Sequence, residues 1–221
     1  MNALTLLKSV EELLYEVVSW LVFYPKTLWM TLSRPLRTMA YSDREQRDKP
    51  DQQYLDTLSP PLFLVLSILL AHGIEIVAGL NIDQSRTAIG RMITGNEQTL
   101  LAVRALMFSL YPLAYAGLFL ALSRKRIDRE TFRAPFFAQC FLSGTLAILI
   151  SLGSIGVRYP SDVATLAGLV LMVVTMVWFL WVQTRWLARI EGIGRAAALG
   201  WSVLAFAVSM GGVIGMGLLI G

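Results

Sequence analysis

Three ionisable residues lie inside stretches of the chain that are otherwise almost entirely apolar: His72, Glu75 and Arg104. His72 and Glu75 are three positions apart, which places their side chains on one face of a helix. An ionised side chain at bilayer depth costs about 2.5–3.5 kcal/mol on insertion scales, so each of these groups needs a partner inside the protein. An imidazole, a carboxylate and a guanidinium in contact would compensate one another's charge.

Two interpretations of this intramembrane charge cluster stay open. In the first, the cluster is a structural ion pair between two helices, because an intramembrane charge must be paired whatever else it does. In the second, Glu75 alternates between its protonated and ionised states as a proton relay, and His72 supplies a second exchangeable site near neutral pH. The first interpretation predicts a sealed cluster, and the second predicts a route by which water or substrate reaches it.

The segments that carry these residues have the length and composition of membrane-spanning helices. About 20 apolar residues, at about 1.5 Å each, cross a hydrocarbon core of about 30 Å. The chain of 221 residues is 56% hydrophobic and 15% charged, so a soluble domain would lack the polar residues to cover its surface. The sequence predicts an all-α polytopic membrane protein with five spans, at residues 60–80, 99–122, 135–157, 161–183 and 197–220.

The order of the spans brings the charged residues to the same depth. The first two spans are antiparallel neighbours, joined by the loop at residues 81–98. Glu75 lies five residues before the end of the first span, and Arg104 lies five residues after the start of the second. We therefore expect the carboxylate and the guanidinium to meet.

The distribution of lysine and arginine predicts the orientation of the spans. Fifteen of these residues lie in residues 1–59, 124–133 and 185–195, whereas the connections on the other side carry three. Basic residues are enriched in cytoplasmic loops. We therefore expect the N-terminus in the cytoplasm and the C-terminus on the opposite side of the membrane.

This layout divides the chain into amphipathic and interfacial helices at residues 1–41, a polar linker at residues 42–59, and the transmembrane bundle at residues 60–221. Apolar residues repeat every three or four positions up to Phe23, and Tyr24 followed by Pro25 is expected to end that helix. Its polar side is mostly acidic, which favours packing on the bundle or on a partner over shallow burial in an anionic lipid surface. A sixth crossing or a re-entrant hairpin at residues 13–32 stays open. The linker has hardly any apolar side chain and is expected to be solvated.

Cationic and indole side chains are expected to hold the chain at the membrane surface. Tryptophan is enriched at membrane–water interfaces, and lysine and arginine are enriched on the cytoplasmic side. The expected interface anchors are Lys26, Trp29, Arg34, Arg37 and Trp186.

A candidate polar pathway continues from the charge cluster along the second span. Tyr111 and Tyr115 lie on the same helical face as Arg104, and Pro112 follows the first tyrosine. A proline frees a carbonyl one turn back and kinks the helix, which can open a small polar cavity lined by the two hydroxyls. Ordinary packing between helices is the alternative.

The last span contains glycines at a spacing that lets helix backbones approach closely. The pairs are Gly211 with Gly215 and Gly217 with Gly221. Gly153 and Gly156 in the third span suggest a similar contact. The pattern predicts helix contact either within the chain or with a second copy of it.

Several classes of function are not expected from this composition. Cys140 is the only cysteine and His72 the only histidine, so neither an internal disulfide nor a cysteine-rich or histidine-rich metal site can form. The basic residues fall in loops rather than along one face, so nucleic acid is not an expected partner. We expect no enzyme and no cofactor, and we expect the lipid bilayer, a membrane-protein partner or a second copy as partners.

The chain resembles the YIP-type family of membrane proteins in its layout, an N-terminal region that precedes five closely spaced spans. The segments Tyr24–Trp29 and Leu58–Leu64 are also similar to segments of that family. Bacterial members of that family often carry a permease label, and eukaryotic members act as trafficking scaffolds. The resemblance implies a bacterial inner-membrane protein that organises membrane or partner proteins without catalysis, with its C-terminus in the periplasm. The alternative is a small secondary transporter or channel that uses His72, Glu75 and Arg104.

Overall fold

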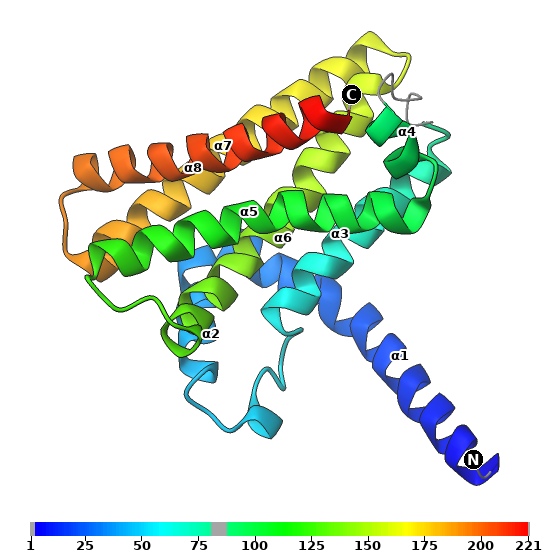
Figure 1. The fold of residues 1–221 in the computed structure, drawn as a ribbon, viewed down its shortest axis with the longest axis horizontal. Helices are drawn as coiled ribbons and strands as arrows, with labels where there is room; N and C mark the ends of the chain where they lie inside the picture. Colours follow the sequence, from blue (N-terminus) through cyan, green and yellow to red (C-terminus); the bar gives the residue numbers. More distant parts are fainter. Residues whose placement is uncertain (1–2, 81–87, 221) are drawn as a thin grey trace.

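The computed structural model describes residues 3–80 and 88–220, and over these residues the chain is all-α (Figure 1). Five of the described helices are long and apolar enough to cross a membrane. They are α3 (Pro60–Val77), α5 (Glu97–Leu122), α6 (Arg129–Arg158), α7 (Asp162–Glu191) and α8 (Arg195–Ile220). The other elements are α1 (Ala3–Ser33), α2 (Pro35–Glu45), the 3-10 turn η1 (Pro50–Gln52) and α4 (Ala88–Thr94). The predicted fold class and the predicted number of spans are confirmed.

Helix α6 is the centre of the bundle. Every residue from Ala138 to Ile148 is buried, and α6 contacts α1, α2, α3, α5 and α7. A helix that is apolar on all sides is stable only where other helices surround it, and this stretch of α6 meets that condition. Helix α8 packs on α5 and α7. The positions of side chains on α3, α5 and α7 are therefore set mainly by how each of these spans meets α6, and α8 is placed by α5 and α7.

The outer faces of the bundle are apolar and exposed within the chain. On α7 the exposed side chains include Val163, Val170 and Val177, and on α8 they include Val208 and Leu218. Monomeric soluble proteins rarely expose apolar surface on this scale, whereas lipid covers it in a membrane. These faces support a lipid bilayer as the environment of the five spans.

Glycines allow α6 and α7 to approach each other closely. The glycines of α8 that were expected to make such a contact behave differently. A Cβ atom on Gly168 would lie 2.4 Å from the Gly153 carbonyl oxygen, so any larger residue there would force the two helices apart. At Gly211, Gly215 and Gly217 a Cβ would meet no atom within 4 Å, while Gly221 lies outside the described residues. The contact within the chain is therefore not seen at these three positions, and the alternative, contact with a second copy, stays a prediction. A different residue, Gly212, faces α5 with its backbone, where a Cβ would lie 2.9 Å from Leu110 Cδ1.

The first helix does not end at Tyr24 and Pro25 as predicted. Helix α1 continues through Pro25 to Ser33, and the break falls where Pro35 begins α2. Tyr24 packs its ring 5.2 Å from that of Phe63 and donates a hydrogen bond to Ser67 Oγ at 3.1 Å. These contacts with α3 hold Tyr24 in helical geometry against the bias that a following proline imposes.

The segment predicted to be a solvated linker is in fact anchored to the bundle. Its first residues complete α2, and the Tyr54 side chain is buried against Phe141 of α6. The Tyr54 hydroxyl shares a hydrogen bond of 3.0 Å with Ser42 Oγ and accepts one of 2.7 Å from Gln46 Nε2. The expectation that this segment buries nothing is wrong, because Tyr54 and Leu58 both enter a core cluster with Phe63 and Phe141.

Candidate functional site

The intramembrane charge cluster is centred on the Glu75 carboxylate, which three spans surround. Glu75 lies in the last turn of α3 and is 6% exposed. Its Oε2 accepts a hydrogen bond from Arg104 Nη1 of α5, and its Oε1 accepts one from Arg158 Nη2 at the end of α6. One carboxylate thus forms two ion pairs, one through each oxygen, and joins α3, α5 and α6 at the same end of the bundle.

His72 lies one turn before Glu75 and faces the same cluster. Its Nδ1 is 3.3 Å from Arg104 Nη1 and 3.8 Å from Glu75 Oε2. A guanidinium can only donate hydrogen bonds, so the contact makes Nδ1 the acceptor and leaves the ring proton on Nε2. His72 Nε2 is buried and has no hydrogen-bond partner among the described residues. The imidazole therefore accepts a hydrogen bond through Nδ1, whereas its Nε2 donor has no partner within the described chain.

Three of the four side chains in this cluster were expected to meet. His72, Glu75 and Arg104 lie where the matched depths of the first two spans place them. Arg158 is the residue that sequence reasoning missed, because it was counted only as a charge in the turn after the third span. The alternating direction of the spans could have placed Arg158 near the cluster, because α3 and α6 both end on the side of the membrane where α5 begins.

The residues of the candidate polar pathway are packed into the hydrophobic core. Tyr111 and Tyr115 are buried with their rings against Phe179, at centroid distances of 6.1 and 5.6 Å. The Tyr115 hydroxyl donates a hydrogen bond of 2.7 Å to the Ser202 carbonyl oxygen of α8. Pro112 is buried beside them. In this conformation the three residues bind α5 to α7 and α8 by packing, which is the alternative left open by the sequence.

Four of the five expected interface anchors lie on the surface, and the fifth does not. Lys26, Trp29, Arg34 and Arg37 are exposed, which suits a position at the membrane surface. Trp186 is only 7% exposed and belongs to the core with Met39 of α2. The expectation for Trp186 is wrong because α2 folds against α7 and covers the indole.

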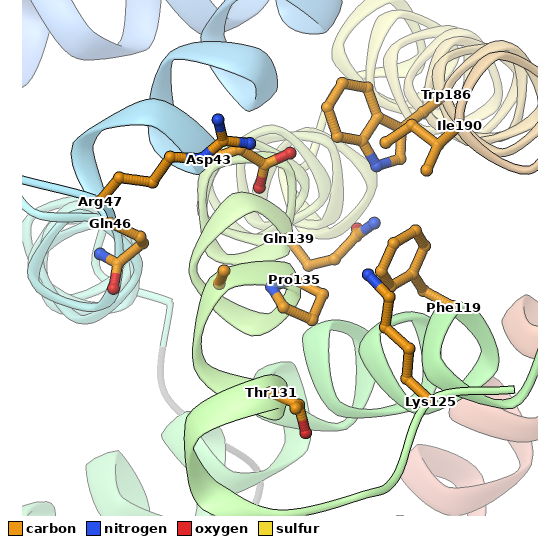
Figure 2. Close-up of a pocket in the computed structure, with 11 residues that line it drawn as sticks. Asp43, Gln46, Arg47, Phe119, Lys125, Thr131, Pro135, Gln139, Trp186 and Ile190 are labelled. Atoms are coloured by element: carbon orange, nitrogen blue, oxygen red, sulfur yellow. The ribbon is translucent and has the colours of Figure 1, made fainter. Parts of the chain in front are cut away.

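A second polar feature, absent from the sequence analysis, lies at the opposite end of the bundle. The buried side chains of Gln139 on α6 and Gln183 on α7 exchange two hydrogen bonds, of 3.1 and 2.5 Å. Gln139 lines a cavity of about 360 Å³ between α2, α5, α6 and α7 (Figure 2). Asp43 and Lys125 lie on the walls of this cavity. The only sequence signal was one glutamine in each of two apolar segments.

The arrangement of Glu75 and its partners is suited to fixing three spans in place, and its chemistry is that of a compensated carboxylate rather than of a metal ligand set. Over residues 3–80 and 88–220, no three His, Cys, Asp or Glu side chains are grouped so that they could hold a metal ion. Comparison with protein-family models, curated proteins and solved structures finds no match to this chain.

Proposed function

We propose that this chain is a noncatalytic inner-membrane protein of the YIP type, which organises a partner protein through α1. In the proposed orientation the N-terminus is cytoplasmic and the C-terminus periplasmic, as the fifteen basic residues on one side and the three on the other favour. The observation that carries the proposal is an apolar face of α1 that no other part of the described chain covers.

That face repeats at helical spacing along the first half of α1. Its residues are Val10, Leu13, Leu14, Val17, Val18 and Leu21, which are between 40% and 73% exposed. Figure 1 shows this half of α1 extending away from the bundle. Exposed apolar stripes of this kind mark helices that enter a groove on another surface. The sequence is also compatible with packing of this face on the bundle, but these residues do not pack on it.

The charge on the other face of α1 favours a protein partner over lipid. Glu11, Glu12 and Glu16 are exposed there and outnumber Lys8. Interfacial helices that bind anionic membranes carry lysine and arginine on the polar face, and acidic side chains are repelled by such a surface. The partner that fits is a protein with an apolar groove bordered by basic residues.

The charge cluster supports a role without transport. Both oxygens of Glu75 are engaged by guanidinium groups, so a proton on this carboxylate would have to displace an ion pair. A buried charge with two partners is costly to disturb, and this favours a fixed connection between spans.

The proposal is tested with a photo-crosslinking residue at position 13 or 17 of the full-length chain in native membranes. We expect a discrete adduct with one other protein at both positions, and none at Tyr15 or Ser19 on the opposite face. Leu13→Asp combined with Val17→Asp should abolish co-purification of that protein, whereas Tyr15→Asp with Ser19→Asp, which adds the same charge, should not. Adducts with lipid alone, or with a second copy of the chain, would contradict the proposal.

A small transporter or channel is the second candidate, favoured by the buried Nε2 of His72 that lacks a partner among the described residues. This function requires water or substrate to reach the cluster. The test replaces Cys140 by Ser and Glu75 by Cys, and then applies membrane-impermeant thiol reagents to sealed vesicles. Labelling of position 75 from either side would support transport. Protection from both sides, in protein that elutes as a folded species, supports the sealed cluster.

A further inference from the structure

Helix α2 lies beside the end of α7 and forms a groove with it. The groove has a volume of about 670 Å³ and adjoins the cavity that Gln139 lines, since both include Asp43, Arg47, Trp186 and Ile190. We name it the arginine groove after the four arginines that line it, which are Arg37, Arg44, Arg47 and Arg189. It belongs to neither the charge cluster nor the apolar face of α1.

The arginine groove carries a strong excess of positive charge. Asp43 is the only acidic residue among those that line it. Within the part of the chain that the structure describes, no hydrogen bond or ion pair engages the side chains of the four arginines. Each guanidinium offers five N–H donors in a planar fork that matches the oxygens of a phosphate group. The groove therefore holds several donors that are free to bind an anion.

Apolar residues also line the groove. Leu36, Ala40 and Ile190 lie there together with the arginines. Along α7, Val177 and Trp181 are exposed at four-residue spacing, and Arg185 stacks its guanidinium 4.5 Å from the Trp181 ring. An exposed apolar row thus leads towards the basic end of α7. A ligand with a charged head and an apolar tail fits this arrangement, whereas a free anion would contact only the arginines.

We propose that the arginine groove binds the phosphate headgroup of an anionic phospholipid, whose acyl chains lie along the exposed face of α7. Basic pockets at the ends of transmembrane helices bind anionic lipid headgroups because cations and apolar surface are both in reach there. Four guanidiniums against one carboxylate favour a lipid with net negative charge over a zwitterionic one. This inference is independent of the partner proposed for α1.

The test measures binding of dioleoyl phosphatidylglycerol and of dioleoyl phosphatidylcholine to the full-length protein in detergent micelles, by native mass spectrometry. We expect the wild type to bind phosphatidylglycerol at least about tenfold more tightly than phosphatidylcholine. Arg44→Gln with Arg47→Gln should remove about tenfold or more of that affinity. The matched control, Arg126→Gln with Arg129→Gln, loses the same charge from exposed arginines that do not line the groove, and should retain the preference. Equal losses in both double variants, or none in either, would overturn the proposal.

Two further measurements distinguish a lipid phosphate from a free phosphate and replace the arginine variant if it does not fold. Inorganic phosphate added at the same concentration as the lipid should not displace phosphatidylglycerol, and displacement would assign the groove to a soluble anion and overturn the lipid assignment. If the arginine double variant does not elute as a folded protein, Asp43→Asn replaces it. Removing the only carboxylate of the groove should raise the affinity for phosphatidylglycerol several-fold, and an unchanged or lower affinity would contradict the proposal.

Discussion

Glu75 and Arg158 lie 83 positions apart in the chain, and their ion pair joins the last turn of α3 to the last residue of α6. The same carboxylate binds Arg104 of α5, so three spans meet through one acidic side chain. Because each oxygen of Glu75 has its own guanidinium, removing one arginine leaves the carboxylate still partnered. This relationship determines how the cluster should respond to substitution.

Replacing both arginines of the charge cluster should destabilise the protein by more than the sum of the single replacements. We expect Arg104→Met and Arg158→Met each to lower the free energy of unfolding by about 1–2 kcal/mol, and the double variant by about 3–5 kcal/mol, because only the double variant leaves a buried carboxylate unpaired. Denaturant unfolding in detergent measures the three values, with Arg126→Met as the exposed control. Strictly additive losses would show that Glu75 does not bridge the two arginines.

The glutamine pair between α6 and α7 should be sensitive to the loss of one partner and tolerant of the loss of both. Gln139→Leu leaves the buried Gln183 amide without its two hydrogen bonds, which costs about 1–3 kcal/mol. In the double variant with Gln183→Leu, both polar groups are gone and the stability should return close to that of the wild type. Thermal unfolding of the two single variants and the double variant decides this, and a double variant less stable than either single one would count against the pairing.

Gly168 should not tolerate a methyl group. Its Cβ would lie 2.4 Å from the Gly153 carbonyl oxygen, so Gly168→Ala must push α6 and α7 apart, at a cost of about 1–3 kcal/mol. Gly200→Ala is the matched control, since a Cβ there meets no atom within 4 Å and alanine favours the helix. Comparison of the two melting temperatures tests the close approach. The prediction is wrong if Gly168→Ala melts at or above the temperature of the control.

Asp43 should make stability depend on pH in the acidic range. Burial raises the pKa of Asp43 to about 6, although Arg47 and Lys125 nearby act to lower it. The folded state then binds the proton more tightly than the unfolded state, so the free energy of unfolding falls as pH rises from about 4 to about 6 and stays level above.

Asp43→Asn should remove this component and stabilise the protein at pH 7.5 by about 1 kcal/mol, allowing for screening by solvent. The check is the difference in melting temperature between wild type and Asp43→Asn at pH 4.5 and at pH 7.5. Our expectation is that the variant melts higher at pH 7.5 and that the difference shrinks at pH 4.5. A difference that does not change with pH would exclude the titration of Asp43 as its cause.

The spans and the meeting of Glu75 with Arg104 were predictable because they depend on local properties of the sequence. A run of apolar residues long enough to cross a bilayer is recognisable without knowing its neighbours. Two consecutive spans must be adjacent, so counting residues from their shared loop places Glu75 and Arg104 at one depth.

The features that sequence reasoning missed all depend on which face of a helix meets which neighbour. Arg158 joins the cluster only because α6 packs directly on α3 and α5. Trp186 is buried because α2 covers α7, and Tyr24 stays helical before Pro25 because Phe63 of α3 holds its ring. The sequence by itself determined the class of the protein, the number of its spans and one ion pair between consecutive spans. Only the tertiary structure decided the second ion pair, the arginine groove and the exposure of α1, because contacts between distant segments depend on the rotation of each helix, which apolar runs do not encode.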